Sequence, residues 1–295
     1  MKRMPRPVYS HQYVAEKIKD SMDPNPRVNA LRPLLQECID SHIWIREENI
    51  YTTAANAGNL NSLDKCVVGT TECSAKVLGE LSKSSMIGLY DQYLRNHGKP
   101  ELRAIYDAIR NAAEDECPYC AGLSSDVDTL DHYLPKSVYP RFAILPPNLV
   151  PACSTCNRIM QASSSEEPGK QFLHPYSDVD KFFNEQWLFA EFSLTSKEIN
   201  FFVNTPELWS DTDKQRVRYH FEKLKLADRL RKRAVREIEG GLRQFEKAKV
   251  RNPALSISEA IEDVFSCWIN IDFLNQWKRV AYMALADAIR SNYPA

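Results

Sequence analysis

The chain has 295 residues, of which 43% are hydrophobic and 26% are charged, and its formal net charge at pH 7 is −1. This composition argues against wholesale disorder, and no apolar run approaches the roughly 18 residues of a membrane-spanning helix. The first residues, MKRMPRPVYSHQYV, have no apolar stretch after the basic ones, so they do not form a secretory signal and the cytosol is the expected compartment.

Residues 1–112 predict a helical region. The apolar residues of 28–51 and of 74–98 recur at the spacing of one helix face, and a further helix is expected to begin at Pro100. We find no catalytic motif in this region, which makes it the natural surface for a protein partner.

Residues 113–180 have a different character. Prolines cluster there and the helical periodicity breaks up, as expected of loops and short strands around a metal site. Residues 162–170 predict a flexible loop.

Residues 181–295 begin with two expected strands at 187–194 and 199–204 and continue as helices from residue 207. Ser256 and Glu259 have the spacing of a helix capping box.

The segment 214–251 is a basic arm. It contains 14 Lys and Arg against 5 Asp and Glu, a local charge of +9, so the other residues sum to −10. One helix face could pack while the other follows phosphates, or the bases could simply be solvated. No aromatic residues are regularly interleaved, which gives base stacking little support.

Eight cysteines are present, and four of them form two C-x-x-C pairs, Cys117/Cys120 and Cys153/Cys156. Each pair directs two thiolates to one point, so together they predict a tetrahedral site that suits structural Zn²⁺. Paired disulfides are the weaker alternative in a reducing compartment. The other cysteines, at positions 38, 66, 73 and 267, are expected to be buried free thiols.

Four polar residues stand between or beside these pairs. Asp131 and His132 are adjacent, Asn148 follows 16 residues after His132, and Asn157 comes directly after Cys156. A metal on Cys156 would therefore set where the Asn157 carboxamide points.

The ordered motifs "LDH", "NLVP" and "CSTCN", lying within residues 115–177, resemble the HNH endonucleases of the ββα-metal (His-Me finger) superfamily, in a variant whose zinc site has four cysteine ligands. The resemblance implies a small zinc-stapled ββα-metal core. The expected fold class is α+β and mainly α-helical, with helical regions on both sides of that core.

The resemblance also implies roles for the four residues. His132 is expected to be the general base that deprotonates water, and Asp131 and Asn157 are expected to bind one catalytic Mg²⁺ or Mn²⁺. Asn148 is expected to tie the loop between the strands and to orient His132. The implied products carry a 5′-phosphate and a 3′-hydroxyl.

One position departs from the family pattern, because Met160 stands where many relatives carry Lys. Arg158 or Lys170 could supply the charge. His174, in "FLHPYSD", is a second candidate for the metal or phosphate surroundings, although it lies far from Asn148 for the third motif position.

The expected function is therefore metal-dependent cleavage of DNA, without readout of its sequence. The segment from "HPYSD" through "WLFAEF" to the basic arm is also similar to HNH subunits of bacterial anti-phage systems such as Septu. That resemblance implies an effector nuclease working with an ATPase, which would be a separate chain because no phosphate-binding loop is present here. An RNA-cleaving nuclease and a non-catalytic zinc-stabilised binding module are the alternatives.

Overall fold

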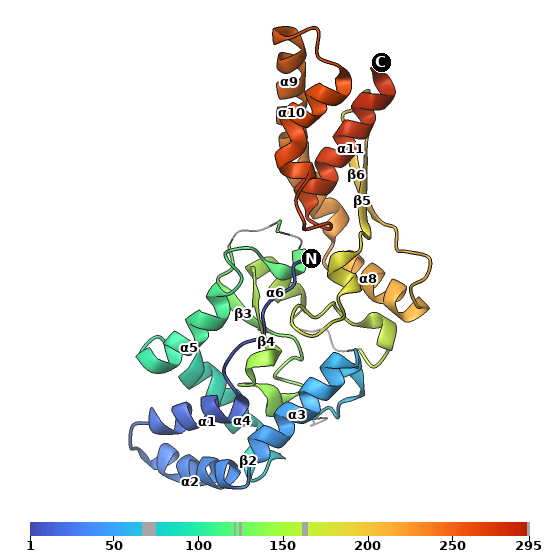
Figure 1. Ribbon diagram of the computed structural model, residues 1–295. Helices are drawn as coiled ribbons and strands as arrows, with labels where there is room; N and C mark the ends of the chain where they lie inside the picture. Colours follow the sequence, from blue (N-terminus) through green and yellow to red (C-terminus); the bar gives the residue numbers. More distant parts are fainter. Residues whose placement is uncertain (67–74, 121, 124–125, 161–164, 294–295) are drawn as a thin grey trace. The chain divides into compact units, whose positions relative to one another are not determined.

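The computed structural model describes residues 1–66, 75–120, 122–123, 126–160 and 165–293 (Figure 1). These residues are mainly helical and contain three antiparallel sheets of two strands each, which confirms the predicted α+β, mainly helical class. Cys73 and residues 162–164 of the predicted flexible loop lie outside the described residues.

The chain forms two compact units. The amino-terminal unit comprises Met4–Asp115 and Asp126–Asp178, and the carboxy-terminal unit comprises Met1–Arg3, Glu116–Ser125 and Val179–Ala295. The division into three regions, with boundaries near residues 112 and 180, stays a prediction.

The amino-terminal unit is built mostly of helices. In chain order its elements are α1 (His11–Asp20), α2 (Pro26–Asp40), α3 (Ile43–Asn56), the 3-10 turn η1 (Leu60–Ser62), β1 (Lys76–Leu78), β2 (Leu81–Ser82), α4 (Lys83–Gly88), the π-helical η2 (Leu89–Leu94), α5 (Pro100–Asn111), β3 (Thr129–His132), the 3-10 turns η4 (Pro140–Phe142) and η5 (Pro146–Asn148), β4 (Leu149–Ala152), α6 (Ser154–Met160) and η6 (Pro168–Lys170).

The helix predicted over 28–51 is in fact two helices. Asn25 caps α2 by accepting a hydrogen bond from the backbone N–H of Val28. The break between α2 and α3 falls at His42, whose φ of 55° is left-handed. Since this conformation cannot continue a right-handed helix, the chain changes direction there.

The helix predicted over 74–98 is wrong for its first part, where β1 and β2 form a hairpin. Gly79 sits between the strands with a φ of 51°, a conformation that suits glycine. A Cβ at this position would lie 3.1 Å from Sγ of Cys38, so the close approach also requires glycine. The apolar residues Leu78 and Leu81 are buried as hairpin residues instead of helix residues.

Strands β3 and β4 pack against α5. Leu130 of β3 and Leu149 of β4 belong to the same buried cluster as three residues of the α5 face, namely Leu102, Ile105 and Ile109. Burial of apolar surface stabilises this contact by about 25 cal/mol per Å², and it holds the strand pair against α5.

Two tyrosines satisfy the backbone of β3 at Leu130. The N–H of Leu130 donates to the Tyr106 hydroxyl at 3.1 Å, and the Tyr90 hydroxyl donates to the Leu130 carbonyl at 3.2 Å. A buried backbone group without a hydrogen-bond partner costs free energy of folding. These bonds therefore fix the position of β3 along α5 and η2.

The carboxy-terminal unit combines one hairpin with long helices. Its elements are the 3-10 turn η3 (Pro118–Cys120), α7 (Lys181–Asn184), β5 (Leu188–Phe192), β6 (Ile199–Val203), α8 (Asp211–Lys223), α9 (Leu226–Arg251), α10 (Ile257–Ile269) and α11 (Trp277–Asn292). The two strands and the later helices were predicted from the sequence and are confirmed. The capping box of Ser256 and Glu259 is also present at the start of α10.

Within this unit α9, α10 and α11 pack together beside the β5–β6 hairpin (Figure 1). Asn275, just before α11, ties the hairpin to the helices. Its side-chain oxygen accepts from the backbone N–H groups of Trp187 and Leu188, and its amide donates to the carbonyl of Glu185.

Three of the scattered cysteines can be compared with their predicted burial. Cys38 is buried, Cys66 is half-buried and Cys267 is exposed on α10. The prediction of a buried thiol is therefore wrong for Cys267, which lies outside the buried face of an amphipathic helix.

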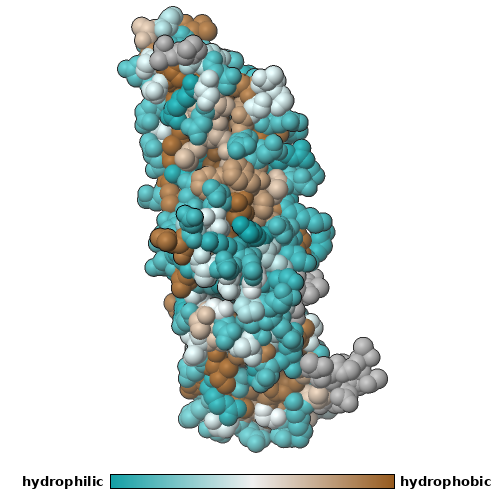
Figure 2. Space-filling view, turned by 90° about the vertical axis from the view of Figure 1, so that its right-hand side faces the viewer, coloured by the Kyte–Doolittle hydropathy of each residue, from teal (hydrophilic) through white to brown (hydrophobic). Residues whose placement is uncertain are grey.

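Among the described residues, every helix is too short or too polar to cross a bilayer. The face in Figure 2 is mostly hydrophilic, with hydrophobic residues in separate patches. Scattered exposed apolar residues of this kind are normal for a protein surface.

Two adjacent glycines of α9 predict opposite effects of the same substitution. A Cβ at Gly241 would lie 2.6 Å from the ring of Tyr282, whereas a Cβ at Gly240 meets no atom within 4 Å. Tyr282 cannot easily move, because its hydroxyl donates to Glu237 and its ring stacks on Trp268.

We therefore expect Gly240→Ala to raise the free energy of unfolding by about 0.5–1 kcal/mol through helix propensity. Gly241→Ala should lower it by about 1–3 kcal/mol through overpacking. Thermal and urea unfolding of both variants measure the difference, and equal effects would show that the α9–α11 contact is looser than the structure has it.

Candidate functional site

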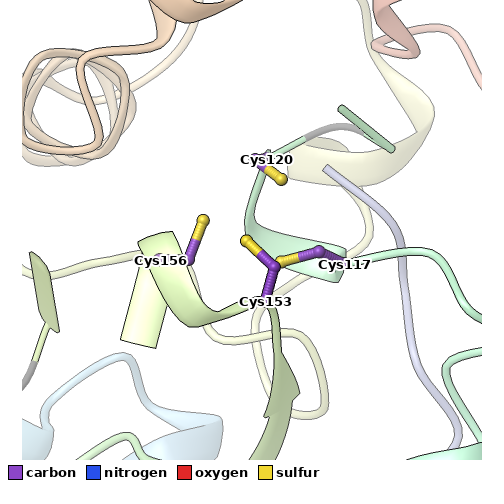
Figure 3. Close-up of side chains that lie close together, drawn as sticks. All are labelled: Cys117, Cys120, Cys153 and Cys156. Atoms are coloured by element: carbon purple, nitrogen blue, oxygen red, sulfur yellow. The ribbon is translucent and has the colours of Figure 1, made fainter. Parts of the chain in front are cut away.

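The two C-x-x-C pairs come together as predicted. Cys117 precedes the turn η3 and Cys120 is its last residue. Cys153 follows β4, and Cys156 lies on α6. All four side chains are buried, and their sulfur atoms lie within 4.8 Å of one another (Figure 3). The sequence separation between the pairs therefore does not keep the thiols apart.

This arrangement fits a zinc ion. With Zn–S bonds of about 2.3 Å, tetrahedral geometry places neighbouring sulfurs about 3.8 Å apart, within the range of the cluster. Buried thiolates repel one another unless a cation balances them. The cluster of four buried cysteines can hold a metal such as zinc, and a site with four protein ligands would be structural.

The predicted site residues lie on a strand pair followed by a helix. Strands β3 and β4 are antiparallel, with Asp131 opposite Val150 and His132 opposite Leu149. Helix α6 starts two residues after β4. Because side chains alternate along a strand, Thr129 and Asp131 point to one face of β3, while Leu130 and His132 point to the other.

Asn157 lies on the same side as Asp131. Its amide nitrogen donates to the hydroxyl of Thr129 at 2.8 Å, so α6 covers the face of β3 that Thr129 and Asp131 share. The structure thus brings the two predicted ligands of the catalytic ion to one face of the strand.

Asp131 is buried in an unusual state. It is 3% exposed, and its Oδ2 has no hydrogen-bond partner among the described residues. Loss of solvation raises the pKa of this carboxyl well above its usual range. A buried carboxylate oxygen without a partner is the kind of group that a bound cation satisfies.

His132 turns to the opposite face, toward η2 and η4. Its Nε2 lies 2.8 Å from the carbonyl oxygen of Ala143, and its ring meets the edge of the Tyr90 ring at 4.3 Å between centroids. A carbonyl can only accept a hydrogen bond, so Nε2 carries the proton and Nδ1 is the basic nitrogen. Burial lowers the pKa of His132 to about 4, which keeps the imidazole neutral.

Asn148 ties the loop that joins β3 to β4. Its side-chain oxygen accepts from the backbone N–H of Leu134 at 2.8 Å, and its amide donates to the carbonyls of Leu134 and Phe142, each at 3.1 Å. The side chain is fully buried. Its bonds go to the loop backbone and the Tyr51 hydroxyl, so Asn148 can act on His132 only through the loop.

Tyr51 of α3 is a residue that the sequence did not single out. Its hydroxyl donates to the Asn148 oxygen at 3.1 Å and lies 3.1 Å from Nε2 of His174. Nδ1 of His174 accepts from the backbone N–H of Tyr176, so Nε2 carries the proton and donates to Tyr51. His174, 1% exposed, thus belongs to a buried hydrogen-bond chain that ends at Asn148.

The charged residues near the motif are mostly engaged elsewhere. Met160 is buried and presents no charge. Arg158 is exposed on α6, and Lys170 pairs with Glu167 at 2.7 Å. Lys136 pairs with Asp91, and Arg141 lies 3.6 Å from the buried Glu47.

Comparison with known proteins gives a relative of nearly equal length. The chain is 32% identical to Protein ea31 of Escherichia phage lambda over 307 aligned positions, which cover 98% of each protein. No family model and no solved structure matches the chain.

The cysteine cluster predicts how the protein responds to loss of one ligand. Cys153→Ser should lower bound zinc from about one ion per chain to well below one, and should destabilise the fold by several kcal/mol because binding energy is folding energy. Metal analysis by mass spectrometry and thermal unfolding measure both effects. Cys267→Ser is the matched control, since Cys267 is exposed on α10 and outside the cluster. A stable, zinc-free Cys153→Ser protein would contradict the structural role.

The loop predicts a second stability effect. Asn148→Ala leaves buried backbone groups of Leu134 and Phe142 without their partner, so we expect a loss of about 2–4 kcal/mol. Asn157→Ala should cost less, because that side chain is only partly buried. Urea unfolding of both variants gives the comparison, and a larger loss for Asn157→Ala would show that the loop does not depend on Asn148.

Proposed function

We propose that this chain, which belongs to the family of Protein ea31 of Escherichia phage lambda, is a metal-dependent HNH endonuclease that hydrolyses DNA phosphodiester bonds. The observation that carries the proposal is the buried, unpartnered Oδ2 of Asp131 on the face of β3 that Asn157 covers. Strands β3 and β4 with helix α6 would then be the ββα-metal core.

Asp131 and Asn157 would hold the catalytic ion, since carboxylate and amide oxygens suit Mg²⁺ and Mn²⁺. When bound, such an ion supplies positive charge to the scissile phosphate and to the leaving 3′ oxygen. Asp131 contributes a carboxylate that is already desolvated, and the Thr129 hydroxyl holds the Asn157 side chain in place.

His132 would accept the proton of the attacking water at Nδ1. The bond from Nε2 to Ala143 fixes both the tautomer and the ring orientation that this role requires. His132 is largely buried, with 8% of its surface exposed, so this role requires water to reach Nδ1.

Asp131 and His132 lie on opposite faces of β3, so the proposal requires the scissile phosphate to lie at the end of the strand, where the two faces meet. In an in-line displacement the attacking water and the leaving oxygen lie on opposite sides of the phosphorus. The base would then act on the water and the ion on the leaving oxygen. Asn148, His174 and Tyr51 would position the loop that follows His132, without touching the reacting atoms.

The cysteine cluster would support the site through the chain itself. Asn157 directly follows Cys156, so zinc on that thiolate fixes the backbone from which the carboxamide projects. Since Met160 cannot contact phosphate, Arg158 is the exposed cation of α6 that can take this part.

The biological context is a separate part of the proposal. The resemblance of the chain to HNH subunits of anti-phage systems suggests an effector nuclease that works with an ATPase partner. Protein ea31 belongs to a phage, so a role on the phage side is the competing context. Co-purification of the tagged chain with an ATPase from its native host would favour the first.

The function is tested by cleavage of supercoiled plasmid DNA with Mg²⁺ or Mn²⁺. We expect His132→Ala to lower the rate by about 10²–10⁴-fold, the usual contribution of a general base, while zinc content and unfolding stay near wild type. Asp131→Asn should abolish the response to added Mg²⁺. His97→Ala is the matched control, because His97 is an exposed histidine outside the site.

Each alternative has its own outcome in this assay. Nicking that survives in His132→Ala would place the base elsewhere. Cleavage of structured RNA but not of DNA would change the substrate. A zinc-loaded wild type that binds nucleic acid and cuts none of these substrates would favour the non-catalytic module.

A further inference from the structure

Helix α9 exposes many more bases than acids. Its exposed bases are Arg231, Lys232, Arg233, Arg236, Arg243, Lys247 and Arg251, and its exposed acids are Asp228, Glu239 and Glu246. The helix runs for 26 residues, so this imbalance is spread over several turns of one rigid element.

Four of these bases form a row along the helix, which we call the basic ridge. It consists of Lys232, Arg236, Arg243 and Lys247. Their spacings of four, seven and four residues keep them within about 60° of one another around the axis, and a rise of about 1.5 Å per residue gives the ridge a length of about 22 Å. The buried residues of α9, such as Ala234, Gly241 and Phe245, lie on the opposite side.

The ridge keeps an excess of positive charge, although the exposed Glu239 lies within the row. None of its four side chains forms an ion pair with another described residue. Two acids of α9 are already engaged, since Asp228 pairs with Arg231 and Glu237 with Lys278. At one end of the ridge a surface hollow of about 360 Å³ is lined by three bases, Lys232, Arg233 and Arg236, and by Glu237, whose carboxylate is engaged with Lys278.

We infer that the basic ridge of α9 binds the phosphate backbone of double-stranded DNA. This inference deepens the proposed function, on which it rests for the choice of DNA, by naming the duplex as the substrate class. A row of cations along a regular helix matches the regular spacing of phosphates along a duplex. Single strands are bound by aromatic side chains that stack on bases, and the single aromatic residue of α9, Phe245, is buried.

The contact is independent of base sequence. Lysine and arginine side chains that reach phosphates position a duplex without reading its bases. Four phosphate contacts predict that the logarithm of affinity falls with the logarithm of salt concentration with a slope of about −3 to −4 from the ridge alone.

The test is binding of the full chain to a labelled duplex of about two helical turns, followed by fluorescence anisotropy at several NaCl concentrations without added Mg²⁺. A variant with Lys232→Gln, Arg236→Gln, Arg243→Gln and Lys247→Gln keeps helix propensity while removing the charges. We expect at least about tenfold weaker binding at roughly 100 mM NaCl and a salt slope smaller in magnitude by about 3 to 4.

Two controls separate the ridge from general charge and from misfolding. Substitution of four exposed bases elsewhere, Lys76, Arg95, Lys197 and Arg290, by Gln should change the affinity by less than about threefold, since these bases do not form a row. Glu239 lies on the ridge between Arg236 and Arg243, so Glu239→Lys should tighten binding, which no loss of structure could produce.

The outcomes distinguish this inference from the proposed function. Equal weakening by the ridge and control variants, or unchanged binding in Glu239→Lys, overturns the ridge as a duplex site. Tighter, ridge-dependent binding of a single strand or of an RNA duplex also overturns the assignment to DNA duplex. Because the assay reads binding, a catalytically silent protein with a ridge-dependent duplex affinity would retain the inference and lose only the nuclease.

Discussion

Four buried sulfur atoms within 4.8 Å of one another impose the constraint on which the candidate site depends. As thiolates they repel one another in a poorly solvated place, and as thiols they gain little from such close approach. A zinc ion turns the repulsion into bonds, and its binding energy becomes folding energy. Since Cys153 directly follows β4 and Cys156 lies on α6, a metal on the cluster would also hold α6 in place.

A second constraint is the alternation of side chains on β3. A strand cannot point two adjacent residues to the same face. Asp131 therefore shares a face with Thr129, to which Asn157 donates, while His132 is held on the other side by Ala143 and Tyr90. This separation follows from strand geometry alone, and under the proposed function the two residues would have separate tasks. The Asn148 hydrogen bonds keep the intervening loop from relaxing this arrangement.

What could be predicted from the sequence was local. The cysteine pairs, the Ser256 capping box and the two strands after residue 187 each depend on residues a few positions apart, and all are present. The hairpin at Gly79 was missed because the spacing of Leu78 and Leu81 fits a helix face as well as a buried pair in a β-hairpin. Tyr51 was missed because 97 residues separate it from Asn148, and no local pattern marks a tyrosine that completes a distant loop. Short strands could be expected around the metal site, but the pairing of β3 with β4 could not be inferred from the sequence. The sequence therefore did not show which face of the strand Asp131 and His132 would each occupy.

The state of Asp131 is the observation that most supports an ion at the proposed site. Burial raises the pKa of the Asp131 carboxyl, so without a cation the charged form is disfavoured, and Oδ2 has no hydrogen-bond partner among the described residues. An apolar residue at this position would pack on β3 without leaving a buried polar atom unsatisfied. A site that takes up a divalent ion gains from it, because the ion restores the lost solvation and desolvation strengthens the attraction. The two charged features of the molecule argue for a ligand in different ways. The bases of the ridge are exposed, so they argue by their arrangement in a row without ion pairs. Asp131 argues by its burial together with an oxygen that has no hydrogen-bond partner among the described residues.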